Sequence, residues 1–146
     1  MPRFNIFLDS SALIAGAISE SGAAHVLLNL GESEDIILTI SELVVVESER
    51  SMARKSPSNI NDLRRLIKSA NLRIVANPSR KEVEANLYLI SDPNDVPILL
   101  AAMKANADYL ATHNRRHFLD DPKVVERSGL RIGTPGEVLA WLRDNL

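Results

Sequence analysis

The chain contains no cysteine, which excludes disulfide bridges, thiolate metal sites and cysteine nucleophiles. Aromatic residues make up only 4% of its 146 residues, so base stacking is not expected to drive binding to nucleic acid. The formal net charge is −2, and no global positive charge favours a polyanionic partner. Any contact with nucleic acid must therefore come from a local basic patch.

Long apolar runs are also missing. Asp9 interrupts the apolar stretch from residue 6 to residue 17, which argues against a signal peptide and a membrane span. Together with the missing cysteines, this predicts a cytoplasmic protein without a membrane partner. The length suits a single domain over residues 1–146, and the 45% hydrophobic and 25% charged residues are typical of a globular protein.

Short apolar runs alternate with segments of helical periodicity along the chain. They predict strands at 4–8, 35–40, 72–75, 108–112 and 130–132, and helices at 12–17, 23–30, 42–55, 61–70, 80–89, 96–105 and 135–146. This alternation predicts an α/β fold, with a mainly parallel sheet of four to five strands covered by helices on both faces. In such sheets, ligands bind beyond the carboxyl ends of the strands.

Four polar residues stand at the ends of predicted elements or within them. They are Asp9, Glu47, Asp95 and Asn114. Three carboxylates and an amide on four different elements cannot belong to one amphipathic face. If the fold brings them together, they form an oxygen-rich site for a hard divalent cation such as Mg²⁺ or Mn²⁺.

Each acid that precedes a helix also has a purely structural interpretation. Asp9 follows a strand and could cap the next helix through its carboxylate. Asp95 could be the N-cap of the helix that contains Pro97, and Asp92 competes with it in the same turn.

Glu47 and Asn114 also have structural alternatives. Glu47 could pair with Arg50 or Arg54 on the surface of its helix, although a buried glutamate needs a cation, donors or a proton. Asn114 is of a residue type that suits turns. His113 and His117 stand four residues apart in a predicted loop, and no third ligand is evident near them, so a zinc site is not expected.

Four segments in order across residues 4–118 together resemble a PIN domain of the VapC-like ribonuclease toxin type. They are Phe7–Ile14, Ser41 to Glu47, Asp92–Leu99 and Ala107–Asn114. The resemblance implies a three-layer α/β/α domain that hydrolyses RNA phosphodiester bonds with Mg²⁺ or Mn²⁺.

The resemblance also assigns roles to individual residues. It implies that Asp9, Glu47 and Asp95 are catalytic acids that hold the metal. The fourth acidic position of the family falls on Asn114, which keeps a carbonyl oxygen but lacks the negative charge. Asp108 stands where the family has a largely structural residue.

RNA contacts are expected next to these acids. Ser10 and Thr112 are candidates for contacts with an RNA phosphate, and Arg115 and Arg116 are the basic residues nearest the predicted site. The expected function is a metal-dependent endoribonuclease, such as the toxin of a toxin–antitoxin pair, with RNA, an antitoxin and a second copy of the chain as partners. The alternative is a PIN-like module that binds RNA or protein with little or no catalysis.

Two other phosphate-handling classes fit less well. A haloacid-dehalogenase-type phosphatase needs a second aspartate two residues after Asp9, where this chain has Ser11. A receiver domain needs an acidic pair near the end of the first strand, and that pair is missing.

Overall fold

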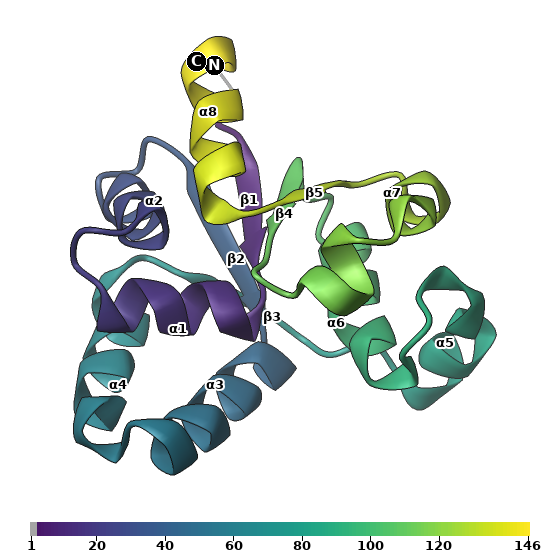
Figure 1. The fold of residues 1–146 in the computed structure, drawn as a ribbon, viewed down its shortest axis with the longest axis horizontal. Coiled ribbons are helices and arrows are strands. Elements are labelled where there is room, and N and C mark those ends of the chain that lie inside the picture. Colours follow the sequence, from purple (N-terminus) through teal and green to yellow (C-terminus); the bar gives the residue numbers. More distant parts are fainter. Residues whose placement is uncertain (1–2) are drawn as a thin grey trace.

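A computed structural model describes residues 3–146 of the chain, which form a five-stranded sheet with helices on both sides (Figure 1). The strands are β1 (Asn5–Leu8), β2 (Ile37–Ser41), β3 (Arg73–Val75), β4 (Tyr109–Ala111) and β5 (Arg131–Gly133). They lie in the order β3-β2-β1-β4-β5, and every neighbouring pair is parallel. The predicted α/β/α architecture with a parallel sheet is confirmed.

The helices are α1 (Ser10–Ile18), α2 (Ala23–Glu32), α3 (Glu42–Lys55), α4 (Ile60–Ser69), α5 (Arg80–Ala85), α6 (Val96–Lys104), α7 (Pro122–Ser128) and α8 (Pro135–Asn145). Short turns of other helical types add η1 (Pro57–Asn59), η2 (Leu87–Leu89), η3 (Pro93–Asp95) and η4 (Arg115–Leu119). The helix predicted over 80–89 is shorter, because it ends at Ala85 and η2 follows.

Sequence reasoning missed α7 and η4. α7 begins with Asp121 as N-cap and Pro122 as first residue, and the Asp121 carboxylate accepts a hydrogen bond from the backbone N–H of Lys123 at 3.0 Å. This is the same cap-then-proline signal that predicted α8 from Thr134 and Pro135. The signal for α7 was therefore present in the sequence.

The strand order places a topological switch at the centre of the sheet. The chain moves outward from β1 through β2 to β3, and then returns to the other side of β1 for β4 and β5. Right-handed crossovers in these two directions put α1 to α4 on one side of the sheet and α5 to α7 on the other, as Figure 1 shows. The carboxyl ends of β1 and β4 meet at the switch, where such sheets bind ligands.

The core forms around the central strand. Ile6, Phe7 and Leu8 of β1 are completely or almost completely buried, because helices cover both faces of the sheet. This explains why the strand reads as an unbroken apolar run. At the opposite, amino-terminal edge, the Asp108 carboxylate accepts a hydrogen bond from the backbone N–H of Asn5 at 2.7 Å. Asp108 therefore ties β4 to β1, away from the predicted site.

Among the described residues, no single helix has the length and apolar character needed to cross a membrane. Within residues 3–146, α1 and α2 reach this length and composition when they are taken together, but the pair is bent by 92° at its junction.

Candidate functional site

Asp9 lies directly beyond β1, at the switch between β1 and β4. It is 6% exposed, and its backbone N–H donates to the carbonyl of Ala111 at 3.2 Å. Its Oδ1 accepts hydrogen bonds from the backbone N–H of Ala12 at 3.0 Å and from the Ser11 hydroxyl at 2.7 Å. The interpretation of Asp9 as a helix cap is therefore confirmed. Its Oδ2 accepts a hydrogen bond from the Thr112 hydroxyl, which leaves a lone pair of Oδ2 free for another ligand.

The Thr112 and Ser11 hydroxyls connect the ends of β1 and β4. Thr112 is completely buried, and its Oγ1 also accepts a hydrogen bond from the backbone N–H of Asn114 at 2.9 Å. Ser11 Oγ accepts from the backbone N–H of His113 at 2.9 Å. The two hydroxyls therefore fix the Asp9 carboxylate against the loop that follows β4. Burial raises the pKa of Asp9, although the hydroxyl donors oppose this rise.

Glu47 approaches the same region from α3, where it is half-buried. Burial is the main reason that its pKa is raised, and the negative charges of Asp95 and Asp9 raise it further. Arg50 partly opposes this shift, but Glu47 forms no ion pair with Arg50 or Arg54 in the described part of the chain. The surface-pair alternative therefore has no contact to support it.

Asp95 stands at the end of η3, where α6 begins. Burial raises its pKa, His117 opposes this shift, and the charges of Asp92 and Asp9 add to it. The Asp95 side chain does not cap α6. Asp92 is the residue that caps this turn, through a 2.9 Å hydrogen bond from the backbone N–H of Asn94 to its Oδ1.

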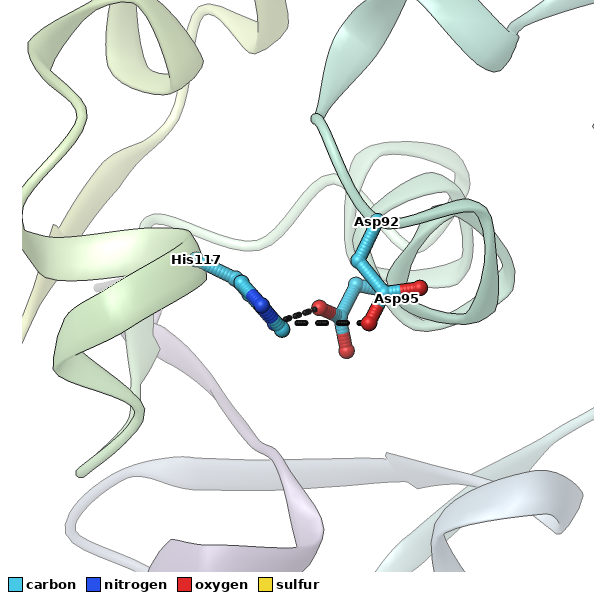
Figure 2. Close-up of side chains that lie close together, drawn as sticks. All are labelled: Asp92, Asp95 and His117. Carbon is cyan, nitrogen blue, oxygen red and sulfur yellow. Dashed lines mark ion pairs between the residues drawn. The ribbon is translucent and has the colours of Figure 1, made fainter.

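The prediction that His117 lacks nearby ligand groups is wrong. His117 belongs to η4, and Figure 2 shows its ring pointing at the carboxylates of Asp92 and Asp95. Its Nδ1 lies 2.8 Å from Oδ2 of Asp95 and 3.5 Å from Oδ2 of Asp92. Spacing along the chain could not reveal this cluster, because the fold brings its members together from two separate loops.

Asn114 is placed beside the site but bonds within its own turn. Its amide oxygen accepts a hydrogen bond from the backbone N–H of His117 at 3.2 Å and thereby caps η4. This contact supports the turn interpretation, and a direct role toward a metal stays a prediction. Arg115 and Arg116, which follow, are exposed and form no ion pair within residues 3–146.

The donor set fits a hard divalent cation. Asp9, Glu47 and Asp95 are close enough that the charge of one raises the pKa of another. Oδ2 of Asp95 is buried without a hydrogen-bond partner. Partly desolvated carboxylates that repel one another and have too few donors are stabilised by a cation. That these three carboxylates are the ligands stays a prediction.

One pocket lies beside the candidate residues, and another lies apart from them. A small one, about 250 Å³, is lined by Glu47, Ser10, Ser51 and two arginines, Arg50 and Arg54. Sequence reasoning did not single out Arg50 as a phosphate contact. Another pocket, about 650 Å³, is lined mainly by residues of α1, α2 and α4 and by none of the three carboxylates. The smaller pocket is the better candidate for a functional cleft, because Glu47, whose pKa is raised, lines it.

Comparison with known proteins agrees with this architecture. A family model described as the PIN domain matches residues 5–116, which is most of the chain. The chain therefore belongs to the PIN domain family. No curated protein sequence gives a significant match.

Solved structures with the same fold are distant in sequence. PAE2754 from Pyrobaculum aerophilum is 16% identical, with a TM-score of 0.66, and the match covers 97% of this chain and 96% of that one. VapBC2 from Rickettsia felis, bound to a DNA fragment from its promoter, is 20% identical with a TM-score of 0.63, over 90% of this chain and 98% of that one. VapC20 from Mycobacterium tuberculosis, a toxin that cleaves the sarcin–ricin loop, is 15% identical with a TM-score of 0.55. The match covers 76% of this chain and 91% of that one.

Proposed function

We propose that this protein is an endoribonuclease that hydrolyses RNA phosphodiester bonds with Mg²⁺ or Mn²⁺. The observation that carries the proposal is that burial raises the pKa of Asp9, Glu47 and Asp95, and that the charge of Asp9 raises the pKa of the other two further. Acidic groups with raised pKa at a ligand-binding edge of the fold are typical of catalytic sites. Membership of the PIN domain family, a family of nucleases, supports the same conclusion.

Each carboxylate has a separate role in this proposal. Asp9 and Asp95 hold the cation, directly or through water, and Glu47 holds it or orients the attacking water. A divalent cation at this place lowers the pKa of a bound water and neutralises charge on the phosphate. Thr112 and Ser11 keep the Asp9 carboxylate in one orientation through their hydrogen bonds.

The RNA backbone is expected to lie across the loops beside the carboxylates. Arg115 and Arg116 are exposed and have no acidic partner in the described residues, so both are available for phosphates. Ser10 shares the smaller pocket with Arg50 and is also placed for a phosphate contact. The Thr112 hydroxyl is buried and donates to Asp9, so we assign it the role of orienting this carboxylate in place of the expected contact with an RNA phosphate.

The structural neighbours support a toxin role. VapC20 is described as a toxin, and VapBC2 was solved in complex with promoter DNA. We propose by analogy that an antitoxin protein binds this chain and that the chain forms a homodimer in the cytoplasm. Val46 of α3 is 47% exposed, which provides an apolar contact for either partner.

The test is an RNA cleavage assay on purified protein with Mg²⁺, with Mn²⁺ and with EDTA. Asp9→Asn keeps an oxygen that can cap α1 but removes the charge, so the fold is retained while cleavage is lost. Glu126→Gln is the matched control, because Glu126 is exposed on α7 with no side-chain contact among those described. Full cleavage in EDTA, or by Asp9→Asn, contradicts the proposal.

One observation favours the alternative of a binding module with little catalysis. Asn114 removes a negative charge from the family's fourth acidic position, and its oxygen is engaged with the backbone of His117. Asn114→Asp should tighten metal binding if this position faces the cation, because affinity for hard cations rises with ligand charge. If the wild type binds RNA without cutting it and Asn114→Asp cuts, the binding-module alternative is correct for the natural sequence.

A further inference from the structure

The side chains of Asp92, Asp95 and His117 form a cluster that shares only Asp95 with the carboxylate site described above. One potential ligand atom from each residue lies within 4.8 Å of the other two. The carboxylates come from the η3 turn and the imidazole from η4, so the cluster spans two loops at the carboxyl side of the sheet (Figure 2). All three residues are partly buried.

A simple ion pair does not account fully for this arrangement. Nδ1 of His117 is 2.8 Å from Oδ2 of Asp95 and 3.5 Å from Oδ2 of Asp92, so a single imidazole nitrogen faces two carboxylate oxygens. Ligands at about 2.0–2.2 Å from one ion are separated by about 3 Å when they are adjacent and by about 4.3 Å when opposite. The observed separations of 2.8 and 3.5 Å correspond to adjacent ligands of one ion.

Local structure directs these atoms toward a common point. Asp92 uses its Oδ1 to cap η3 through the backbone of Asn94, which leaves Oδ2 for the cluster. Asn114 caps η4 through the backbone N–H of His117 and so fixes the turn that carries the imidazole. Short π-type turns of this kind are frequent at functional sites.

We propose that Asp92, Asp95 and His117 bind a first-row transition-metal ion, with Mn²⁺ preferred over Mg²⁺. Mg²⁺ takes oxygen ligands, whereas an imidazole nitrogen favours transition-metal ions. This inference deepens the proposed function, and it depends on that function only because Asp95 belongs to both sites. It also gives Asn114 a role: the amide that stands in place of an acid positions a nitrogen ligand three residues later.

The test measures metal binding apart from catalysis. Metal-free protein is titrated with Mn²⁺ and the free ion is counted by its EPR signal, while pulsed EPR on the bound ion detects coupling to a nitrogen nucleus. Calorimetry gives the affinity for Mg²⁺. The variants are His117→Gln and Asp92→Asn, and circular dichroism checks that both fold. His113→Gln is the matched control, an exposed histidine in the same loop without a side-chain hydrogen bond in the described structure.

We expect nitrogen coupling in the wild type and in His113→Gln, and its loss in His117→Gln. The Mn²⁺ affinity of His117→Gln should fall about tenfold or more, because loss of even a residue that only orients a metal ligand typically costs about 10- to 100-fold. Its Mg²⁺ affinity should change less. Asp92→Asn should weaken Mn²⁺ binding and retain the coupling.

Two results overturn the inference: no nitrogen coupling in the wild type, or unchanged Mn²⁺ affinity in His117→Gln. Either result makes His117 a counter-ion of Asp95 rather than a ligand. The proposed nuclease function fails differently, through absent RNA cleavage by the wild type. A protein that cleaves RNA without nitrogen coupling disproves only this inference, and one that shows the coupling without cleavage disproves only the function.

Discussion

Acidic side chains in two regions of this protein respond in opposite ways to folding. At the carboxyl edge of the sheet, burial raises the pKa of Asp9, Glu47 and Asp95, and neighbouring carboxylates raise the pKa of Glu47 and Asp95 further. On the exposed helix α5, Lys104 donates to Glu82 at 2.7 Å, and this bond together with the capping bond to Ser79 lowers the pKa of Glu82 to about 2.

The difference separates a structural acid from a candidate ligand. Glu82 completes a capping box and an ion pair, so every feature of its surroundings favours the charged form. Asp9 at the sheet edge is buried even though three donors reach its carboxylate, and its charge disfavours the ionised forms of the partly buried Glu47 and Asp95. Such an arrangement opposes folding unless a cation or a proton compensates it. We infer that the acids at the carboxyl edge of the sheet bind a ligand and that Glu82 of α5 stabilises the fold.

The largest expected effect is on RNA cleavage. Asp95→Asn removes a charge shared by the carboxylate site and the His117 cluster, and cleavage should fall by about 10²-fold or more, the loss typical of removing a key electrostatic group. Glu82→Gln should cleave at the wild-type rate, because Glu82 lies on exposed α5 and its contacts are with Ser79 and Lys104. The measurement compares the initial rates at which the two variants cleave one RNA at saturating Mn²⁺. Equal losses in both variants mean that the two regions do not differ.

The next effect is on stability in the presence of metal. A cation that binds only the folded protein stabilises it by about 2.7 kcal/mol at a concentration 100 times its Kd. Thermal unfolding should show a gain of this order for the wild type with Mn²⁺. Glu47→Gln should be more stable than the wild type without metal, because one repulsive charge is gone, and should gain less from Mn²⁺. An identical gain in both proteins excludes Glu47 from the site.

A third effect concerns pH. The folded-state pKa of Asp9 and Asp95 lies above the ordinary value of 3.8, and that of Glu47 lies above 4.5. At a pH between the ordinary and the raised pKa values, the folded state therefore binds more protons than the unfolded state. The stability of the metal-free protein should therefore fall as pH rises from about 4 through the raised pKa values. Saturating Mn²⁺ should reduce this slope. Denaturant unfolding at a series of pH values measures it, and a stability that rises throughout this range contradicts the account.

The smallest effect is expected for Glu82 of α5. Its replacement by glutamine should lower the stability, whereas Glu47→Gln should raise it in the absence of metal. Glu82→Gln loses the charged bond to Lys104, so its melting temperature should be slightly below that of the wild type at neutral pH. Because the folded pKa of about 2 lies below the ordinary value of 4.5, this contribution is present above pH 4.5 and is lost as pH falls through about 2. The two melting curves should converge in acid. If Glu82→Gln melts at a higher temperature than the wild type, both glutamine variants are stabilised and the predicted difference between the two regions is wrong.

Local sequence signals predicted most of the fold. The buried run before Asp9 marked β1, and the Ser41 cap with the following periodicity predicted α3 with its observed bounds, Glu42–Lys55. The parallel sheet followed from the alternation of strands and helices. These features depend on neighbours in the chain, which a sequence displays directly.

The contacts of the site depended on the fold and were less accessible. Nothing in the spacing of Asp92 and His117 indicates that their side chains meet, because η3 and η4 are separate turns that only the folded chain brings together. The capping role of the Asn114 amide likewise appears only once η4 is formed. The predicted carboxylates could be named from the family resemblance, whereas the nitrogen beside them could not.

The central claim is that the carboxylates at the sheet edge hold a divalent cation, and calorimetric titration of metal-free protein with Mn²⁺ tests it most directly. The account predicts saturable binding to the wild type and to Glu126→Gln with equal affinity. It predicts binding about tenfold weaker or more in both Asp9→Asn and Glu47→Gln, since each removes a charge from the site. The same affinity in all four proteins, or no saturable binding to the wild type, contradicts it.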